Sequence, residues 1–349
     1  MERERLISLA VIVRDEAAAL PRLLEGHRAL YDEAVVVDTG SRDGSPAVAQ
    51  RLGARVASFT WCDDFSAARN AALALCSCPW VLVLDADEHV SVDDQDALRG
   101  LVAAAEPGGI ALPQWNYSDD PGLPGWLPVE RSRAVEARGA PGYVVAHQVR
   151  VFPADPRLRY AGRVHENIEA AIVAAGLSVQ RAEIPIHHQG HRGNPGREAA
   201  RLARDGHLLR LKLHEEPASP RARYEMAVQL LQEGQPDLAR RLLEALVAAA
   251  PDGVRAFEAW GLLGRLAVAG GDHEAALAAS LRAVALRPDL AEGWLDLIRV
   301  RWLGGDQVGA REALAEFARL FPRDPRLAAL TAQVQAPNAD NGNRGGPCA

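Results

Sequence analysis

The sequence predicts an α/β domain built on a parallel sheet, followed by an all-α repeat domain. Over the first hundred residues, continuous apolar runs alternate with helical patterns, which is typical of a parallel sheet covered on both faces. From about residue 220 the pattern becomes helical and repeats. A length of 349 residues also favours two cores over one. We therefore expect domains at 1–215 and 216–335, and a disordered tail at 336–349.

Apolar β-type runs mark the strands of the first domain. They are Leu6–Val13, Ala34–Val37, Arg55–Phe59 and Val81–Leu84. We expect Asp15 to cap the first helix, Ser45 to cap the second, and Ser91 to begin a later one through a capping box. Residues 113–160 are rich in Pro, Gly, Trp and Arg, so we expect loops and short strands there.

The second domain shows an internal repeat of about 34 residues. Tryptophan, glycine and proline recur at that spacing in the pairs Trp260 and Trp294, Gly271 and Gly305, and Pro288 and Pro322. Small residues in the turn and a closing proline are the signature of tetratricopeptide helix pairs. Each pair buries its apolar face against its neighbours, so about three copies are the minimum for stability.

Composition excludes several classes of protein. With 48% hydrophobic and 24% charged residues, the chain resembles a water-soluble globular protein. The net charge of −7 argues against non-specific binding to nucleic acid, which needs a basic surface. Apolar runs are too short for a transmembrane segment, the start lacks a signal-peptide cleavage site, and four cysteines are too few for a disulfide scaffold. We expect a cytoplasmic protein with reduced thiols.

Paired carboxylates follow the fourth predicted strand. Asp85 and Asp87 are two residues apart, so an extended backbone would point both side chains the same way. Such a pair suits Mg²⁺ or Mn²⁺, which could neutralise a leaving diphosphate. A bare Asp-x-Asp is more often a solvated turn. Here Asp38 also follows a buried strand, at the edge where open α/β sheets bind ligands, which favours a binding site.

Three segments together resemble glycosyltransferase family 2, in its bacterial branch with C-terminal tetratricopeptide repeats. They are Asp38-Thr-Gly-Ser-Arg-Asp43, Phe65-Ser-Ala-Ala-Arg-Asn70 and Leu84-Asp-Ala-Asp-Glu88, and the resemblance covers roughly residues 6–191. It implies a GT-A, Rossmann-like nucleotide-sugar-binding fold and a metal-dependent inverting transferase of the hexosyltransferase type. By that similarity Asp38 contacts base or ribose, Asp85 lies on the sugar or ribose side, and Asp87 binds the metal. Many relatives have a second Asp at Thr39, so contacts made by that carboxylate are in doubt.

Two arginines have open roles. Arg69 could pair with diphosphate oxygens or form a surface ion pair with Asp63 or Asp64. Arg150 could face the donor phosphates or serve as a structural strand residue.

The family's Gly-x-x-His-Glu element resembles the segment that ends in His165 and Glu166. Inverting transfer needs a base for the acceptor's proton, and Glu166 is the first candidate, with His165 next. A His-rich segment follows the expected strand Ile184–Ile186. GT-A enzymes commonly supply one late histidine to the metal. His188 aligns best, His187 is the fallback, and a solvated turn is as good an interpretation for His187 and His191.

The leading functional hypothesis is transfer of a sugar from a nucleotide diphosphate-sugar, with a UDP-sugar favoured, to a peptide, a protein or a cell-envelope glycan. The alternative is a catalytically weak nucleotide-sugar-binding scaffold that acts through its repeats. A nucleotidyltransferase would need a Gly-rich basic loop after the first strand, where this chain has the acidic stretch Val13–Ala17. The sequence is compatible with a homodimer.

Overall fold

The structure is a computed structural model that describes residues 5–123, 125–190, 195–253 and 255–335. It divides into two compact units, Met1–Leu208 and Leu209–Ala349. The division falls inside one long helix, which ends at Glu215. The domain boundaries drawn from the sequence stay predictions, and the expected tail at 336–349 lies outside the described residues.

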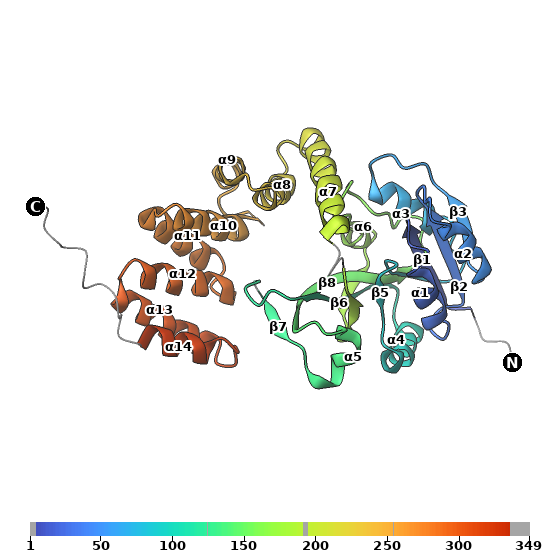
Figure 1. Ribbon diagram of the computed structural model, residues 1–349, viewed down its shortest axis with the longest axis horizontal. Helices are drawn as coiled ribbons and strands as arrows, with labels where there is room; N and C mark the ends of the chain where they lie inside the picture. The colour runs from blue at the N-terminus through green and yellow to red at the C-terminus, as the bar shows by residue number, and fades with distance from the viewer. Residues whose placement is uncertain (1–4, 124, 191–194, 254, 336–349) are drawn as a thin grey trace, which may run out of the picture. The chain divides into compact units, whose positions relative to one another are not determined.

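The N-terminal unit is a mixed α/β fold (Figure 1). Its strands are β1 (Ile7–Val13), β2 (Glu33–Asp38), β3 (Arg55–Ser58), β4 (Trp80–Val83), β5 (Glu88–His89), β6 (Gly108–Ser118), β7 (Trp126–Pro128), β8 (Gly142–Pro153), β9 (Ser178–Arg181) and β10 (Ile186–His188). Its helices are α1 (Leu20–Gly26), α2 (Ser45–Arg51), α3 (Phe65–Leu73), α4 (Val92–Ala104), α5 (Ala134–Ala137), α6 (Glu169–Ala174) and α7 (Pro195–Glu215), with a short 3₁₀ helix at Arg131–Arg133.

The sheet has the order β3-β2-β1-β4-β8-β6-β10-β5. The first four strands are parallel, as expected, but β8 runs antiparallel to both β4 and β6. The sheet is therefore mixed where a parallel one was expected. Helices cover both faces: α1, α2 and α4 pack on one and α3 and α6 on the other, through two separate apolar clusters.

Residues 113–160 differ from the expectation of loops and short strands. They include most of β6 and all of β8, which have 11 and 12 residues and pair along their length. Glycine and proline weakened the strand signal, but tertiary packing decides the outcome. Gly142 lies so close to Trp126 that a Cβ would stand 2.1 Å from its ring, a packing reason for glycine.

The helix starts also differ from expectation. Asp15 does not cap α1, whose N-cap is Ala19; Asp15 has a positive φ of 59°, and its carboxylate accepts the Arg42 N–H. Ser45 is the first residue of α2, after Gly44. Ser91 does precede α4, and its hydroxyl donates to Asp94, but the side chain accepts no backbone N–H.

The C-terminal unit is helical throughout its described part. Its helices are α8 (Pro220–Gln232), α9 (Pro236–Ala249), α10 (Ala256–Ala269), α11 (His273–Leu286), α12 (Ala291–Leu303), α13 (Gln307–Leu320) and α14 (Leu327–Gln335). Consecutive helices pack on each other, as Figure 1 shows from brown to red. The repeated Gly271 and Gly305 have φ of 76° and 80°, which explains glycine at that turn. In the described residues, no helix is both long and apolar enough to span a bilayer.

Candidate functional site

The turn after β4 carries Asp85 and Asp87, and the buried Glu88 holds it in place. Glu88 is 2% exposed, and its carboxylate accepts the Asp85 N–H at 2.8 Å and Arg150 Nη2 at 2.6 Å. Gln114 also donates to it. Burial raises the pKa of Glu88 despite Arg150. Glu88 lies within the Leu84–Glu88 motif, but nothing in the sequence marks it as the anchor of the turn.

His188 lies beside Asp87, with His188 Nε2 3.2 Å from Asp87 Oδ2. Its Nδ1–H donates to Asn116 Oδ1 at 2.8 Å, across the parallel pair β6 and β10. This bond orients Nε2 towards the carboxylate. Burial lowers the pKa of His188, but hydrogen bonding and the charge of Asp87 outweigh it, so the net shift is upward. No motif in the sequence marks Asn116 as a partner of this histidine.

His187 faces the other side of the sheet. It is fully buried and hydrogen-bonds through Nδ1 to the Tyr117 hydroxyl at 2.8 Å. Burial lowers the pKa of His187 to about 4, so its imidazole is neutral at neutral pH. Both histidines lie in β10, whereas the sequence placed them after a strand at Ile184–Ile186. Of the two, only His188 lies next to the carboxylates; His191 falls outside the described residues.

Arg69 connects Asp85 to Glu166. Its Nη2 donates to Asp85 Oδ1 at 2.8 Å and its Nε donates to Glu166 Oε1. Burial opposes the charge of Asp85, yet the guanidinium groups of Arg69 and Arg150 lower the pKa of its carboxyl to about 2. Of the two roles left open for Arg69, the structure shows ion pairing, but with these two carboxylates and not with Asp63 or Asp64.

Arg150 is 4% exposed and paired with Glu88. Of the two roles left open by the sequence, this geometry favours the structural one.

Glu166 lies in a short loop closed by paired backbone hydrogen bonds between Ala161 and Asn167, both 3.0 Å. His165 is exposed and has a positive φ of 52°, a conformation that L-residues rarely adopt. The Glu166 side chain is 11% exposed. The loop therefore directs Glu166 inward, towards Arg69, and leaves His165 outward.

Asp38 ends β2 at the same edge of the sheet as Asp85, with β1 between their strands. It is 7% exposed, and its carboxylate accepts the N–H groups of Gly40 and Ser41 at 3.2 Å. Thr39 donates its hydroxyl to Val13 O at 3.0 Å. The threonine thus fixes the turn to β1.

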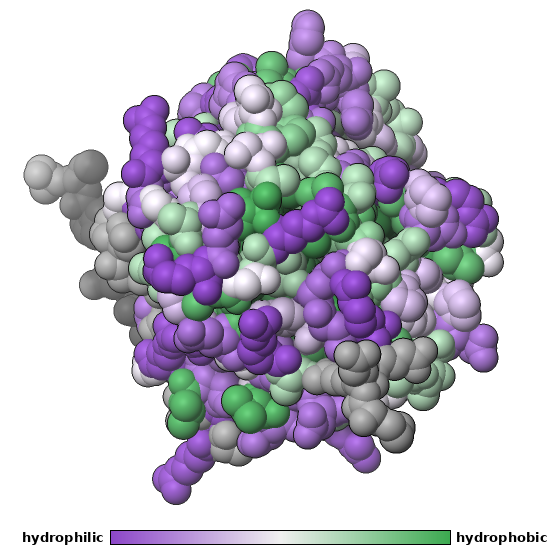
Figure 2. Space-filling model, turned by 90° about the vertical axis from the view of Figure 1, so that its right-hand side faces the viewer, coloured by the Kyte–Doolittle hydropathy of each residue, from purple (hydrophilic) through white to green (hydrophobic). Residues whose placement is uncertain are grey.

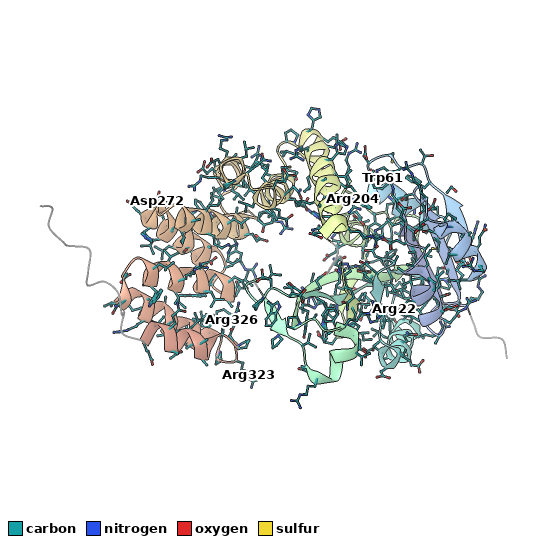
Figure 3. The ribbon with its side chains drawn as sticks, viewed as in Figure 1. Arg22, Trp61, Arg204, Asp272, Arg323 and Arg326 are labelled. Carbon is teal, nitrogen blue, oxygen red and sulfur yellow. The ribbon has the colours of Figure 1, made fainter. Side chains whose placement is uncertain are left out.

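Aromatic side chains support the start of α3. The Trp61 and Phe65 rings pack edge to face with centroids 4.9 Å apart, and the Arg204 guanidinium lies 5.0 Å from the Phe65 centroid. Figure 3 labels Trp61 and Arg204. Trp61 and Phe65 therefore pack against each other and against Arg204 at the start of this helix. On the face drawn in Figure 2, hydrophilic residues surround smaller hydrophobic areas.

Asp87 and His188 are suitable donors for a divalent cation, because one carboxylate and one imidazole converge and Asn116 orients the imidazole. Across the described ranges, no group of three or more His, Cys, Asp or Glu side chains is arranged to hold a metal. Mg²⁺ is commonly held by one or two carboxylates together with substrate phosphates, so a small protein donor set fits such an ion.

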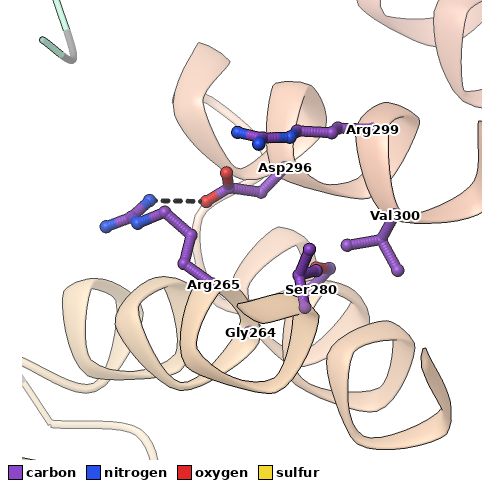
Figure 4. Close-up of a pocket in the computed structure, with 7 residues that line it drawn as sticks. Gly264, Arg265, Ser280, Asp296, Arg299 and Val300 are labelled. Carbon is purple, nitrogen blue, oxygen red and sulfur yellow. Dashed lines mark hydrogen bonds and ion pairs between the residues drawn. The ribbon is translucent and has the colours of Figure 1, made fainter. Parts of the chain in front are cut away.

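The C-terminal unit contains a pocket of about 200 Å³ (Figure 4). It lies between α10, α11 and α12 and is lined by Gly264, Arg265, Val268, Ser280, Asp296, Arg299 and Val300. Arg265 Nη1 donates to Asp296 Oδ2 at 2.7 Å. A Cβ on Gly264 would stand 3.4 Å from Ser280 Oγ, an ordinary van der Waals contact.

Comparisons with known proteins agree with the two units. The model of glycosyl transferase family 2 matches residues 8–152, and a tetratricopeptide repeat model matches 224–291 and 262–325. An uncharacterized glycosyltransferase of Rickettsia felis is 35% identical over 98 residues, which are 28% of this chain and 34% of the relative. A TPR repeat-containing protein of Synechococcus elongatus is 50% identical over 93 residues, 27% of this chain and 23% of the relative.

The chain thus spans about a quarter to a third of the length of these curated relatives. Among solved structures, the crystal structure of MamA protein matches with a TM-score of 0.35 and 20% identity, over 41% of this chain and 76% of that one. Residues 8–152 of the N-terminal unit thus match glycosyl transferase family 2, and the C-terminal unit carries tetratricopeptide repeats.

Proposed function

We propose that the protein is an inverting glycosyltransferase that uses a nucleotide diphosphate-sugar, with a UDP-sugar as the favoured donor. The observation that carries the proposal is that Arg69 joins Asp85 to Glu166, while Asp87, on the same turn as Asp85, pairs with His188. The match of residues 8–152 to a glycosyl transferase family supports it. These ion pairs make the assignment more specific than the Asp-x-Asp alone.

Each side chain has a distinct part in the proposed reaction. Asp38 contacts the base or ribose, and Asp85 lies on the sugar or ribose side. Asp87 and His188 would hold Mg²⁺ or Mn²⁺, which when bound supplies positive charge to the leaving diphosphate. Glu166 takes the proton of the acceptor hydroxyl as its oxygen bonds to the anomeric carbon. The bond from that carbon to the diphosphate oxygen breaks, which leaves a nucleoside diphosphate and a product of inverted configuration.

The donor proposal is tested by calorimetry and by hydrolysis of UDP-glucose, UDP-N-acetylglucosamine and GDP-mannose, each with Mn²⁺, Mg²⁺ or excess chelator. We expect Asp87→Asn to abolish metal-dependent turnover and to weaken donor binding. Asp93→Asn is the matched control, because Asp93 is exposed in the first turn of α4. Full activity of Asp87→Asn, or of the native protein in chelator, would refute the metal assignment.

For the acceptor, we propose a peptide or protein segment that the repeat unit holds. Helical repeats present extended concave surfaces for such ligands. The pocket between α10, α11 and α12 supports this, because Arg265, Asp296 and Arg299 line it and offer charged groups to a polar peptide. The protein is incubated with a labelled donor and an extract of the source cells, and the mixture is then treated with protease. Label released as small peptides supports a protein acceptor; label that resists protease and partitions with envelope glycans contradicts it.

A further inference from the structure

Helix α3 supports the loop that carries Glu166. Asn70 makes two hydrogen bonds to the backbone of Tyr160, donating to its O and accepting from its N, both at 2.9 Å. At the other end of the helix, the Phe65 N–H donates to Arg163 O at 2.9 Å. This segment is therefore attached to α3 at two points, Tyr160 and Arg163, both of which precede Glu166.

Arg69 adds a third contact from α3, to Glu166 itself. Its residue exposure is 9%, and its Nε and Nη2 donate to Glu166 and Asp85, respectively. The guanidinium carbon also lies 5.7 Å from the Tyr160 ring centroid. Its Nη1 is buried and, within the described residues, has no hydrogen-bond partner. The guanidinium is thus enclosed by protein, with two of its nitrogens committed to carboxylates.

This geometry constrains where the Glu166 carboxylate points. A guanidinium is a planar fork whose N–H directions are fixed, so the position of Asp85 on one arm sets the position of Glu166 on another. The guanidinium also separates the Asp85 and Glu166 carboxylates, and its positive charge offsets the repulsion between them. The left-handed backbone of His165 costs free energy that surrounding contacts must offset, and the Arg69–Glu166 contact is one of them.

We propose that Arg69 is a positioning residue that acts through Glu166: it orients the base carboxylate relative to Asp85 and does not itself bind the donor diphosphate. This inference rests on the proposed function, because it takes Glu166 to be the base. It gives the Phe65–Asn70 motif a role, since that motif supplies both Asn70 and Arg69 to the same loop. The competing role is direct pairing of Arg69 with the donor.

A double-mutant cycle between Arg69 and Glu166 tests the inference. Turnover of the best donor from the panel named above is measured for the native protein, Arg69→Gln, Glu166→Gln and the double variant, with donor affinity from calorimetry. A misplaced catalytic group can cost about 10²-fold in rate, so we expect Arg69→Gln to lower kcat by about 10²-fold. In the Glu166→Gln background the same change should lower kcat by less than about threefold, because the group it positions is absent.

Donor affinity separates the two roles of Arg69. We expect Arg69→Gln to lower donor affinity by no more than about threefold, through the effect of the substitution on Asp85. A loss of donor affinity above tenfold, or equal losses of kcat in both backgrounds, would overturn the positioning role. Full activity of Glu166→Gln gives a different result: it would refute the base assignment in the proposed function, and this inference with it.

Two further variants control for folding. Arg69→Lys keeps the positive charge but lacks the planar guanidinium. We therefore expect this variant to fold and to show most of the decrease in kcat that Arg69→Gln shows. Native kcat in Arg69→Lys would contradict the geometric role. Arg99→Gln removes another arginine paired with a carboxylate, Asp32, on the opposite face of the sheet from α3. It should lower stability without changing kcat.

Discussion

Replacing Glu88 by alanine should destabilise the N-terminal unit by about 3–5 kcal/mol. The substitution removes the partner of Arg150, which is 4% exposed, and leaves that guanidinium buried without its carboxylate. It also leaves the Asp85 N–H and the Gln114 amide without their acceptor. An orphaned buried donor costs about 1–3 kcal/mol, but these terms overlap, so the stated range covers the whole effect.

Removing both charges should cost less than removing one. In Glu88→Ala with Arg150→Met no buried charge is left uncompensated, and we expect a loss of about 1–3 kcal/mol from the remaining orphaned donors. Glu106→Ala is the matched control, because Glu106 is exposed and should change stability by no more than about 0.5 kcal/mol.

Hydrogen exchange in increasing urea measures these effects, because peptides from β1 and β2 report the N-terminal unit separately from the helical unit. A loss below about 1 kcal/mol for Glu88→Ala would refute the anchoring role of Glu88. A double variant less stable than Glu88→Ala alone would show that the charges do not compensate each other.

Three further predictions follow from the packing of the N-terminal unit. Gly142→Ala should lower its melting temperature, because a Cβ would stand 2.1 Å from the Trp126 ring; unchanged melting would mean that the strand shifts freely. Burial raises the pKa of Cys76 to about 12, so at pH 8 iodoacetamide should label the exposed Cys62 first, as peptide mass spectrometry can verify. Burial also lowers the pKa of His27 below 6.5, so the unfolded chain binds the proton more readily than the folded protein. The free energy of unfolding should therefore fall as the pH drops below about 6.5. His27→Gln should make this pH dependence less steep, and an unchanged pH dependence would contradict the prediction.

Patterns that depend on local chemistry predicted much of the fold. Apolar runs located β1, β2 and β4, because a strand buried on both faces needs them. The 34-residue spacing predicted the helical repeats, because glycine is needed at each left-handed turn, as at Gly271. The position of β8 was not predictable in this way, since its register comes from pairing with distant strands.

The same distinction between local patterns and contacts of distant segments applies to the candidate site. Parallel strands bring their carboxyl ends to one edge, so the sequence could place Asp38 and Asp85 together. Contacts between distant segments left no local signal. The pairing of Arg69 with Glu166 and the orientation of His188 by Asn116 depend on tertiary structure alone.

The most direct test of the account compares turnover with donor binding in Glu166→Gln. A general base contributes about 10²–10⁴-fold to rate and acts on the acceptor, so kcat should fall by that factor while donor affinity measured by calorimetry stays within about threefold. Glu106→Gln, at an exposed position, should change neither quantity. Unchanged kcat in Glu166→Gln, or loss of donor binding in place of turnover, would contradict the assignment of Glu166 as the base.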